Sequence, residues 1–507
     1  MARLMRLESG LGMALRIVAE LPVDFDRGQT APDFQPLWSA AGPDAAQVHG
    51  ARPRGGVEER IERMAATTAS AASSTPLERD ARLVNAREHR IRPGEIAVGV
   101  IIGRSSEFFD FFVYAIASVL VFPSLIFPYA DALTGTLYAF AIFSLAFVAR
   151  PFGALAFMWI DRRHGRGVKL TAALFLLGGS TAAMAFLPGY AQVGGVAAVI
   201  LAVLRIGQGF AQGGTWDGLP ALLSLSAPPE RRGWFRMIPQ LGAPIGMFVA
   251  SALFAFLLVT LRPADFLDWG WRYPFFVAFV INVVALFARL RLISTPEFER
   301  LYESRELQPS PVASLFREEW RTVLLGAFAP LASFALFHLV TVFPLSWVVL
   351  TSSDAPLRFL VIELVGAAVG LAAVAVSGVI ADRIGGQTVL GLSAALIAAY
   401  SGFAPGLLSE GPVGEWTYVL VGFALLGLAF GQSSGALNAS FSPKHRYTGA
   451  GTTATAAWFI GAGFAPLVAL LLASNFGLIS VGAYLLSGAV CTLVALALNR
   501  TLKRHAA

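Results

Sequence analysis

The sequence predicts an all-α integral membrane protein with about twelve transmembrane helices, arranged as two halves of six. Three observations indicate this class. Hydrophobic residues make up 56% of the chain and charged residues only 14%, whereas a soluble domain carries about 25% charged residues. Apolar runs long enough to cross a bilayer, which takes about 20 residues, recur from Ile96 almost to the C-terminal end. Landmarks of the first six runs also return in the last six.

The first 93 residues lack long apolar runs and are rich in Arg, Ala, Ser, Pro and Gly. A segment of this composition cannot bury a core, so we expect residues 1–93 to form a disordered cytoplasmic extension. Its best apolar run, Leu11 to Leu15, is followed by Arg16 and does not read as a secretory signal. An alternative interpretation is that translation begins at Met64.

The twelve expected spans follow from the hydropathy pattern alone. Their approximate bounds are 96–122, 133–160, 168–189, 193–218, 234–260, 272–293, 322–349, 358–380, 388–408, 416–440, 449–473 and 477–498. Arginine and lysine gather in every second loop and beside both ends of the membrane region. Because positive charge stays on the cytoplasmic side, both termini are expected in the cytoplasm.

The longest loop between spans, residues 294–321, is densely charged and is expected to be cytoplasmic. It separates an N-terminal half, 94–293, from a C-terminal half, 322–507. Asp161 and Arg162 follow the second span, and Asp382 and Arg383 follow the eighth, about 220 residues later. Gln212 in the fourth span and Gln432 in the tenth have nearly the same spacing. Repeated halves with a site at their interface are typical of secondary transporters.

Other classes of protein fit the sequence poorly. A single cysteine, Cys491, rules out a disulfide within one chain, and six scattered histidines show no metal-ligand spacing. We therefore expect no metal or cofactor, and we see no catalytic cluster that would indicate an enzyme. The net charge of +6 lies in short loops between apolar runs, which a membrane explains better than nucleic acid does. The expected partners are a lipid bilayer, a small solute and protons, and the chain is expected to be a monomer.

The first span carries Arg104, Glu107 and Asp110 near its middle. At about 1.5 Å per residue from Ile96, the two acids lie roughly 16–21 Å deep, near the bilayer midplane. Charge at that depth marks a functional site by default. One interpretation is a structural Arg104–Glu107 pair, which leaves Asp110 without a partner on its own helix. We expect Glu107 and Asp110 to serve proton coupling, with Asp110 as the better proton site and Arg104 as a brace.

Arg205 in the fourth span lies at about the same depth as these acids. It is expected to hold the charge of an anionic solute, or alternatively only to neutralise Asp110. Arg150 lies deeper and is interpreted as a helix brace. His338 is interpreted as a satisfied packing histidine, and Glu363 either has a function or merely snorkels. The residues expected to line the cavity beside Arg205 are Gln208, Gln212, Trp216 and Gln432.

The segment from Gly378 to Gly386 resembles the loop signature G-x-x-x-D-R-x-G of the major facilitator superfamily. Asp382 can accept hydrogen bonds from a neighbouring helix N-terminus, so Asp382 and Arg383 are expected to form a latch that opens and closes. In the first copy, Asp161-Arg162, Phe157 stands at the glycine position and one extra residue precedes Gly165. That copy is either a weaker latch or a plain positively charged loop.

Several segments resemble one branch of this superfamily, the metabolite:proton symporters. They are Glu107-Phe-Phe-Asp110-Phe, Arg150-Pro151-Phe-Gly153, Arg205-Ile-Gly-Gln208-Gly209, Asp268-Trp-Gly-Trp-Arg272 and Thr295-Pro296-Glu297-Phe298. The resemblance implies a major-facilitator fold, alternating access, and proton-driven uptake of small carboxylates or zwitterionic osmolytes through the inner membrane.

The chain departs from this branch in the fourth span. The branch usually places Glu after the two glycines, and here Thr215, Trp216 and Asp217 follow Gly214. We interpret the shift as an altered substrate preference; a relocated structural acid is the alternative. Export by the same fold and a transport-inactive solute sensor are further alternatives to import.

Overall fold

The computed structural model describes residues 93–215, 223, 227–293, 309–352, 356–434 and 440–506, all within one compact unit. The regular secondary structure of these residues is entirely helical. Ten helical stretches among them are long and apolar enough to cross a membrane. Two more helices complete the predicted twelve: α4, whose middle carries three ionisable residues, and the shorter α20. The predicted all-α membrane class is confirmed.

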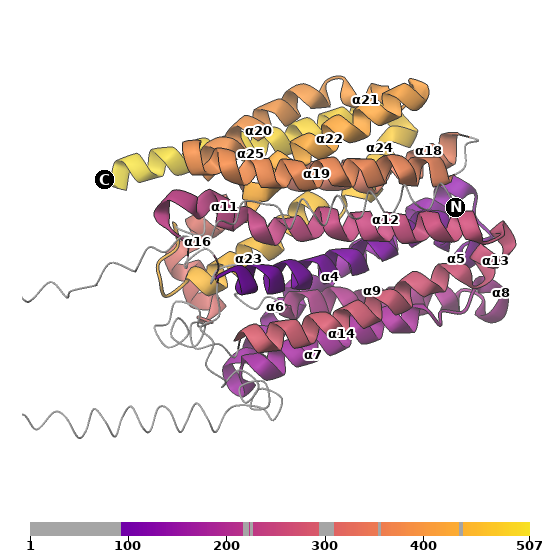
Figure 1. The fold of residues 1–507 in the computed structure, drawn as a ribbon, viewed down its shortest axis with the longest axis horizontal. Helices are drawn as coiled ribbons and strands as arrows, with labels where there is room; N and C mark the ends of the chain where they lie inside the picture. The colour runs from indigo at the N-terminus through magenta and orange to yellow at the C-terminus, as the bar shows by residue number, and fades with distance from the viewer. Residues whose placement is uncertain are drawn as a thin grey trace, which may run out of the picture. The chain divides into compact units, whose positions relative to one another are not determined.

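The first half of the described chain contains six spanning segments joined by short helices. The spans are α4 (Pro93–Leu120), α6 (Ala132–His164), α7 (Arg166–Met184), α9 (Val196–Gly214), α11 (Arg232–Met237) continued by α12 (Gly242–Thr260), and α14 (Tyr273–Ile293). Three short helices, α5 (Phe122–Ile126), α8 (Tyr190–Val193) and α13 (Pro263–Asp268), lie together at one end of the bundle (Figure 1).

The second half begins earlier than the sequence predicts. Helix α16 starts at Val312, inside the expected loop 294–321, and is interrupted by non-helical backbone at Glu319. Residues 294–308 of that loop and the extension before Pro93 lie outside the described residues. The remaining helices are α17 (Leu331–Thr341), α18 (Phe343–Thr351), α19 (Pro356–Ile384), α20 (Gly386–Ser401), α21 (Ala404–Leu407), α22 (Gly411–Ser433), α23 (Arg446–Ala457), α24 (Ala465–Phe476) and α25 (Leu478–Ala506).

Two spans are interrupted by irregular helical turns. A 3₁₀ turn at Ile238–Leu241 separates α11 from α12 and contains Pro239, which cannot donate a helical hydrogen bond. A π-helical turn at Trp458–Ala462 joins α23 to α24. Such irregular backbone inside a membrane segment is tolerated where neighbouring helices cover it, and π turns occur frequently at functional sites.

Both halves use the same close helix contact. In the first half, a Cβ atom at Gly209 or Gly213 of α9 would overlap the backbone of α6. In the second half, a Cβ atom at Gly427 or Gly431 of α22 would meet α19. Glycines four residues apart let membrane helices approach closely. This shared packing supports the expected duplication.

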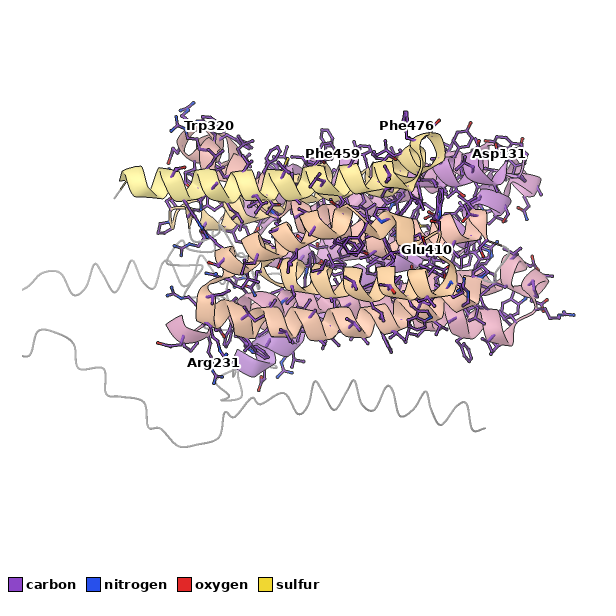
Figure 2. The ribbon with its side chains drawn as sticks, turned by 90° about the horizontal axis from the view of Figure 1, so that it is seen from above. Asp131, Arg231, Trp320, Glu410, Phe459 and Phe476 are labelled. Atoms are coloured by element: carbon purple, nitrogen blue, oxygen red, sulfur yellow. The ribbon has the colours of Figure 1, made fainter. Side chains whose placement is uncertain are left out.

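The long axis of the bundle separates two polar ends from an apolar middle. Figure 2 shows Asp131 at one end and Arg231 and Trp320 at the other. Between the ends, large apolar side chains such as Phe152, Phe175 and Phe256 remain exposed. Large apolar side chains exposed in this way suit contact with lipid tails rather than water.

Candidate functional site

Asp110 lies in the core of the bundle and is 1% exposed. Its Oδ1 accepts a hydrogen bond of 2.6 Å from the Thr181 hydroxyl of α7. Its Oδ2 is buried and has no hydrogen-bond partner. One carboxylate oxygen of Asp110 is therefore satisfied and the other is open to a proton.

Thr181 connects Asp110 to two residues of α9. The Gln208 side-chain amide donates to Thr181 Oγ1 at 2.7 Å. Arg205 Nη1 in turn donates to Gln208 Oε1 at 3.0 Å. A chain of hydrogen bonds therefore links Arg205 through Gln208 and Thr181 to Asp110, and we call these four residues the relay. Within the described residues, Arg205 and Asp110 form no direct ion pair. This geometry does not support direct neutralisation of Asp110 by Arg205.

Arg205 is buried between aromatic rings. Its guanidinium carbon lies 4.0 Å from the ring centre of Tyr114 and 4.6 Å from that of Phe143. Its Nε donates to the Phe143 carbonyl at 3.2 Å. Its Nη2 and the Tyr114 hydroxyl are both buried without a partner. A buried cation with an unused donor is costly, and an anionic ligand would satisfy it.

Glu107 is held by two arginines. Arg104 on the same helix pairs with its Oε2, and Arg289 of α14 donates to its Oε1 at 2.5 Å. Arg289 also donates to the Thr215 carbonyl at 3.1 Å. Arg289 was not among the residues predicted from the sequence, although a cation inside the predicted span 272–293 indicates a buried ion pair. This double pairing fits Glu107 better as an ionised anchor than as a free proton acceptor.

Gln212 and Arg150 line the same cavity. The cavity is also lined by Arg104, Glu107, Thr215 and Trp458. Arg150 stacks over the Trp458 ring, with 5.8 Å between the guanidinium carbon and the ring centre. Gln212 therefore lies beside Arg150, and Gln208 alone of the predicted glutamines contacts Arg205.

Two residues differ from their sequence-based interpretation. His338 is fully buried against Phe111, Phe143 and Phe337, yet neither ring nitrogen has a hydrogen-bond partner. The interpretation of His338 as a satisfied histidine is wrong. Glu363 is 0% exposed and both its carboxylate oxygens lack partners, so the snorkelling interpretation is wrong as well. Aromatic side chains of both halves cover His338. Snorkelling of Glu363 would need a path to solvent, which the buried side chain lacks.

Gln432 lies away from Arg205. Its Nε2 donates to the Gly233 carbonyl of α11 at 3.2 Å and to Ser377 Oγ at 3.4 Å. The structure therefore places Gln432 at the contact between α22 and α11, because α11 packs across that end of the second half. Trp216 lies outside the described residues.

Asp382 has the geometry expected of a latch. Its Oδ1 accepts hydrogen bonds from the backbone amides of Gly233 and Trp234, at 2.7 and 3.1 Å. These amides belong to the first turn of α11, so the contact joins the two halves. Arg383 is exposed beside it.

Asp161 also joins the two halves, through side chains. Its Oδ2 pairs with Lys169 Nζ at 2.9 Å and accepts from the Tyr447 hydroxyl of α23 at 3.4 Å. Lys169 donates to the same hydroxyl at 2.9 Å. Asp161 is 3% exposed, which does not fit a plain solvated loop, whereas Arg162 is exposed. The contacts of Lys169 and Tyr447 with Asp161 could not be predicted from the sequence, because neither residue belongs to a recognisable motif.

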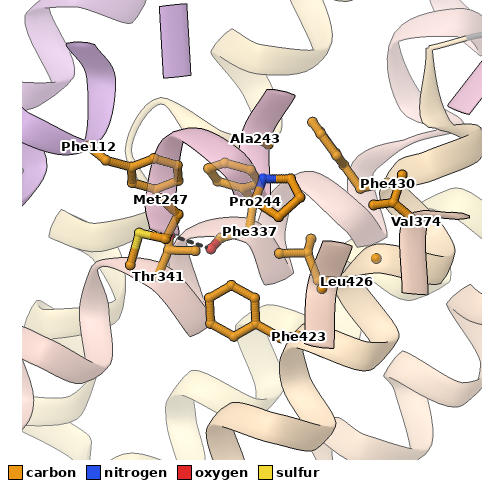
Figure 3. Close-up of a pocket in the computed structure, with 12 residues that line it drawn as sticks. Phe112, Ala243, Pro244, Met247, Phe337, Thr341, Val374, Phe423, Leu426 and Phe430 are labelled. Carbon is orange, nitrogen blue, oxygen red and sulfur yellow. Dashed lines mark hydrogen bonds between the residues drawn. The ribbon is translucent and has the colours of Figure 1, made fainter. Parts of the chain in front are cut away.

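A second cavity between the halves is apolar (Figure 3). Figure 3 shows Phe112, Met247 and Pro244 from the first half facing Phe337 and Phe423 from the second. The Thr341 hydroxyl is directed to the Phe337 carbonyl at 2.7 Å. This cavity offers no charged group to a solute, so the polar functions belong to the relay and to the cavity beside Arg150.

Twelve helical spans among the described residues, buried charges in the core and contacts between the two halves fit a membrane transporter. The family model of the Major Facilitator Superfamily matches residues 106–446, and the chain belongs to this superfamily. It is 37% identical over 417 residues to the inner membrane metabolite transport protein YhjE of Escherichia coli strain K12, covering 80% of this chain and 93% of that protein. It is 29% identical over 411 residues to the shikimate transporter of the same strain, covering 78% and 92%.

The solved structure of the proton:xylose symporter XylE has the same fold. The TM-score is 0.60 at 15% sequence identity, and the match covers 79% of this chain and 94% of XylE. The major-facilitator fold predicted from the sequence is confirmed. The protein is a multi-pass membrane transporter.

Proposed function

We propose that this protein imports a small carboxylate-bearing metabolite or osmolyte together with protons across the inner membrane, with both termini in the cytoplasm. The observation that carries the proposal is the buried relay from Arg205 through Gln208 and Thr181 to Asp110. It joins an arginine with an unused donor to a carboxylate with an unused acceptor. Binding of an anion at one end and of a proton at the other would keep the site electrically balanced.

The relay accommodates both protonation states of Asp110. The Thr181 hydroxyl lies 2.6 Å from Asp110 Oδ1 and 2.9 Å from the Leu177 carbonyl. When Asp110 is ionised, the hydroxyl donates to the carboxylate. When a proton binds the unpartnered Oδ2, Oδ1 can still accept the hydrogen bond from the Thr181 hydroxyl. The relay therefore keeps its contact with Asp110 in both protonation states.

Other residues would hold and gate the site. Glu107 remains ionised between Arg104 and Arg289 and fixes α4 against α14. Asp382 and Asp161 close one end of the bundle while the solute is bound, and release of their contacts opens that end. Rocking of the two halves, 94–293 and 322–507, around the relay would then expose the site alternately to the two sides.

The relatives support the solute class and the coupling ion. One of them is named a shikimate transporter, and shikimate bears a carboxylate. The structure with the same fold is titled a proton:xylose symporter. An inner-membrane location is part of the name of the YhjE relative.

Transport by purified protein in liposomes with an imposed pH gradient tests the proposal, with shikimate as the first solute. Asp110→Asn should abolish accumulation against a concentration gradient and preserve solute exchange, because the amide mimics a permanently protonated acid. Asp131→Asn is the matched control: Asp131 is an exposed N-cap of α6, and asparagine caps helices equally well.

Accumulation by the Asp110→Asn variant would contradict proton coupling through Asp110. Proton-driven efflux rather than uptake would favour the exporter alternative. Binding without exchange or accumulation in the unmodified protein would favour a sensor.

A further inference from the structure

The cavity beside Arg150 contains more positive than negative charge. Arg104 and Arg150 line it together with Glu107, the single carboxylate among its lining residues. Glu107 is already shared by Arg104 and Arg289. Arg150 has no carboxylate within ion-pair distance in the described part of the chain, and its buried Nε has no hydrogen-bond partner. The interpretation of Arg150 as a brace therefore lacks a carboxylate partner in the described part of the chain.

Arg150 is positioned to bind an anion on its way between Arg205 and the latched end. It lies two turns beyond Phe143 on α6, toward Asp161, so it is roughly 10 Å nearer the latched end than Arg205. Gln212 lies one turn beyond Gln208 on α9 in the same direction and lines the same cavity. An anion leaving Arg205 toward that end would meet Arg150 next.

Trp458 adds a flat apolar wall. It opens the π turn of the eleventh span and contacts Phe147, Phe334 and Phe337. The extra residue of a π turn redirects side chains relative to an unbroken helix. Here it places an indole of the second half over a guanidinium of the first half.

We propose that this cavity is a second anion-binding site, in which Arg150 binds a carboxylate and Trp458 contacts the flat or apolar part of the same solute. This second site depends on the proposed function, the transport of carboxylates. It adds a binding position between Arg205 and the latches. Gln212 supplies a further polar group. Because the two principal side chains come from different halves, a bound solute links the halves at this level.

The test uses the purified full-length protein with benzoate as probe and benzamide as its neutral counterpart. Benzoate should raise the melting temperature of the unmodified protein through mass action, and benzamide should not. Arg150→Gln should weaken benzoate binding at least tenfold. Trp458→Leu should weaken it several-fold. Arg163→Gln, which removes a guanidinium stacked on Trp159 at the surface, should leave binding unchanged.

The melting temperature without ligand separates a binding site from a brace. Removing Arg150 relieves repulsion among buried cations, so Arg150→Gln should melt at the same temperature or higher. A large drop would support the brace and overturn the proposal. Absence of benzoate binding in the unmodified protein, or unchanged binding in Arg150→Gln, would overturn it as well. Arg150→Lys, which keeps the charge but loses the planar fork, should bind benzoate at intermediate strength.

The liposome assay distinguishes failure here from failure of the proposed function. If Asp110→Asn loses accumulation while Arg150→Gln binds benzoate normally, proton-coupled transport is supported and the second site is contradicted. If Arg150→Gln loses benzoate binding while Asp110→Asn accumulates solute normally, the second site is supported and proton coupling through Asp110 is contradicted.

Discussion

At the scale of single residues, this transporter combines satisfied and unsatisfied groups in one buried network. Gln208 and Thr181 have partners on both sides, whereas Arg205 Nη2 and Asp110 Oδ2 have none. A buried polar group without a partner costs about 1–3 kcal/mol. The unsatisfied atoms therefore mark the two places where a solute and a proton would bind most favourably.

Arg205→Lys tests the solute end of this network. Lysine keeps the charge and loses the planar two-point grip on a carboxylate, as well as the bond to Gln208. We expect solute affinity to fall at least tenfold, measured by calorimetry on the purified variant. Unchanged affinity in a folded variant would show that Arg205 is structural.

Thr181→Val tests the connection between the two ends. Valine has nearly the same shape but cannot bond to Asp110 or Gln208. We expect solute binding to be retained in part, while the dependence of binding on pH is lost. Thr181→Ser keeps the hydroxyl and should restore that dependence. If the valine variant keeps the pH dependence of the unmodified protein, the relay does not couple the two ends.

At the scale of helices, the two loop signatures make different contacts at the proposed latches. Asp382 accepts from two backbone amides of α11, whereas Asp161 pairs with a buried lysine and a tyrosine. The sequence departure at Phe157 predicts that the first latch contributes less. The structure favours a comparable contribution, because Asp161→Asn would remove the carboxylate that pairs with the buried Lys169.

We therefore expect Asp161→Asn to slow transport about as strongly as Asp382→Asn, measured as initial uptake rates in liposomes. Asp161→Asn should also lower the melting temperature more. Asp265→Asn removes an exposed ion pair with Arg262 and serves as the control, since exposed pairs contribute little. Normal uptake by Asp161→Asn would show that only the second signature works as a latch.

At the scale of the whole molecule, the contacts of both proposed latches are made in this structure and the relay is buried. Opening of the latched end would expose the cavity between α6 and α23, which Thr452 lines together with Lys169 and Tyr447. A cysteine at this position reports that opening. The single native cysteine, Cys491, allows a clean background after Cys491→Ser.

Thr452→Cys should react slowly with a maleimide in the latched protein and several times faster when Asp382→Asn is added. Ser474→Cys, on an exposed surface of α24, should react at one rate in both backgrounds. Equal rates for Thr452→Cys with and without the latch mutation would contradict opening at this end.

The sequence by itself determined the membrane class, the number of spans, the repeated landmarks and the presence of charges inside the spans. These properties are local, since hydropathy and the rise of a helix depend on no distant residue. The buried charges at Asp110, Glu107 and Arg205 were predictable for this reason, and the contact of Asp382 with a helix N-terminus followed from the loop signature.

Only the tertiary structure decided which of these charges meet. The rotation and register of each helix set the contacts, and no single segment encodes them. They bring Thr181 between Asp110 and Gln208, Arg289 onto Glu107, and Tyr447 onto Asp161, and they take Gln432 away from Arg205. A partner for a buried charge comes from whichever helix faces it, and that choice is made by packing across the whole bundle.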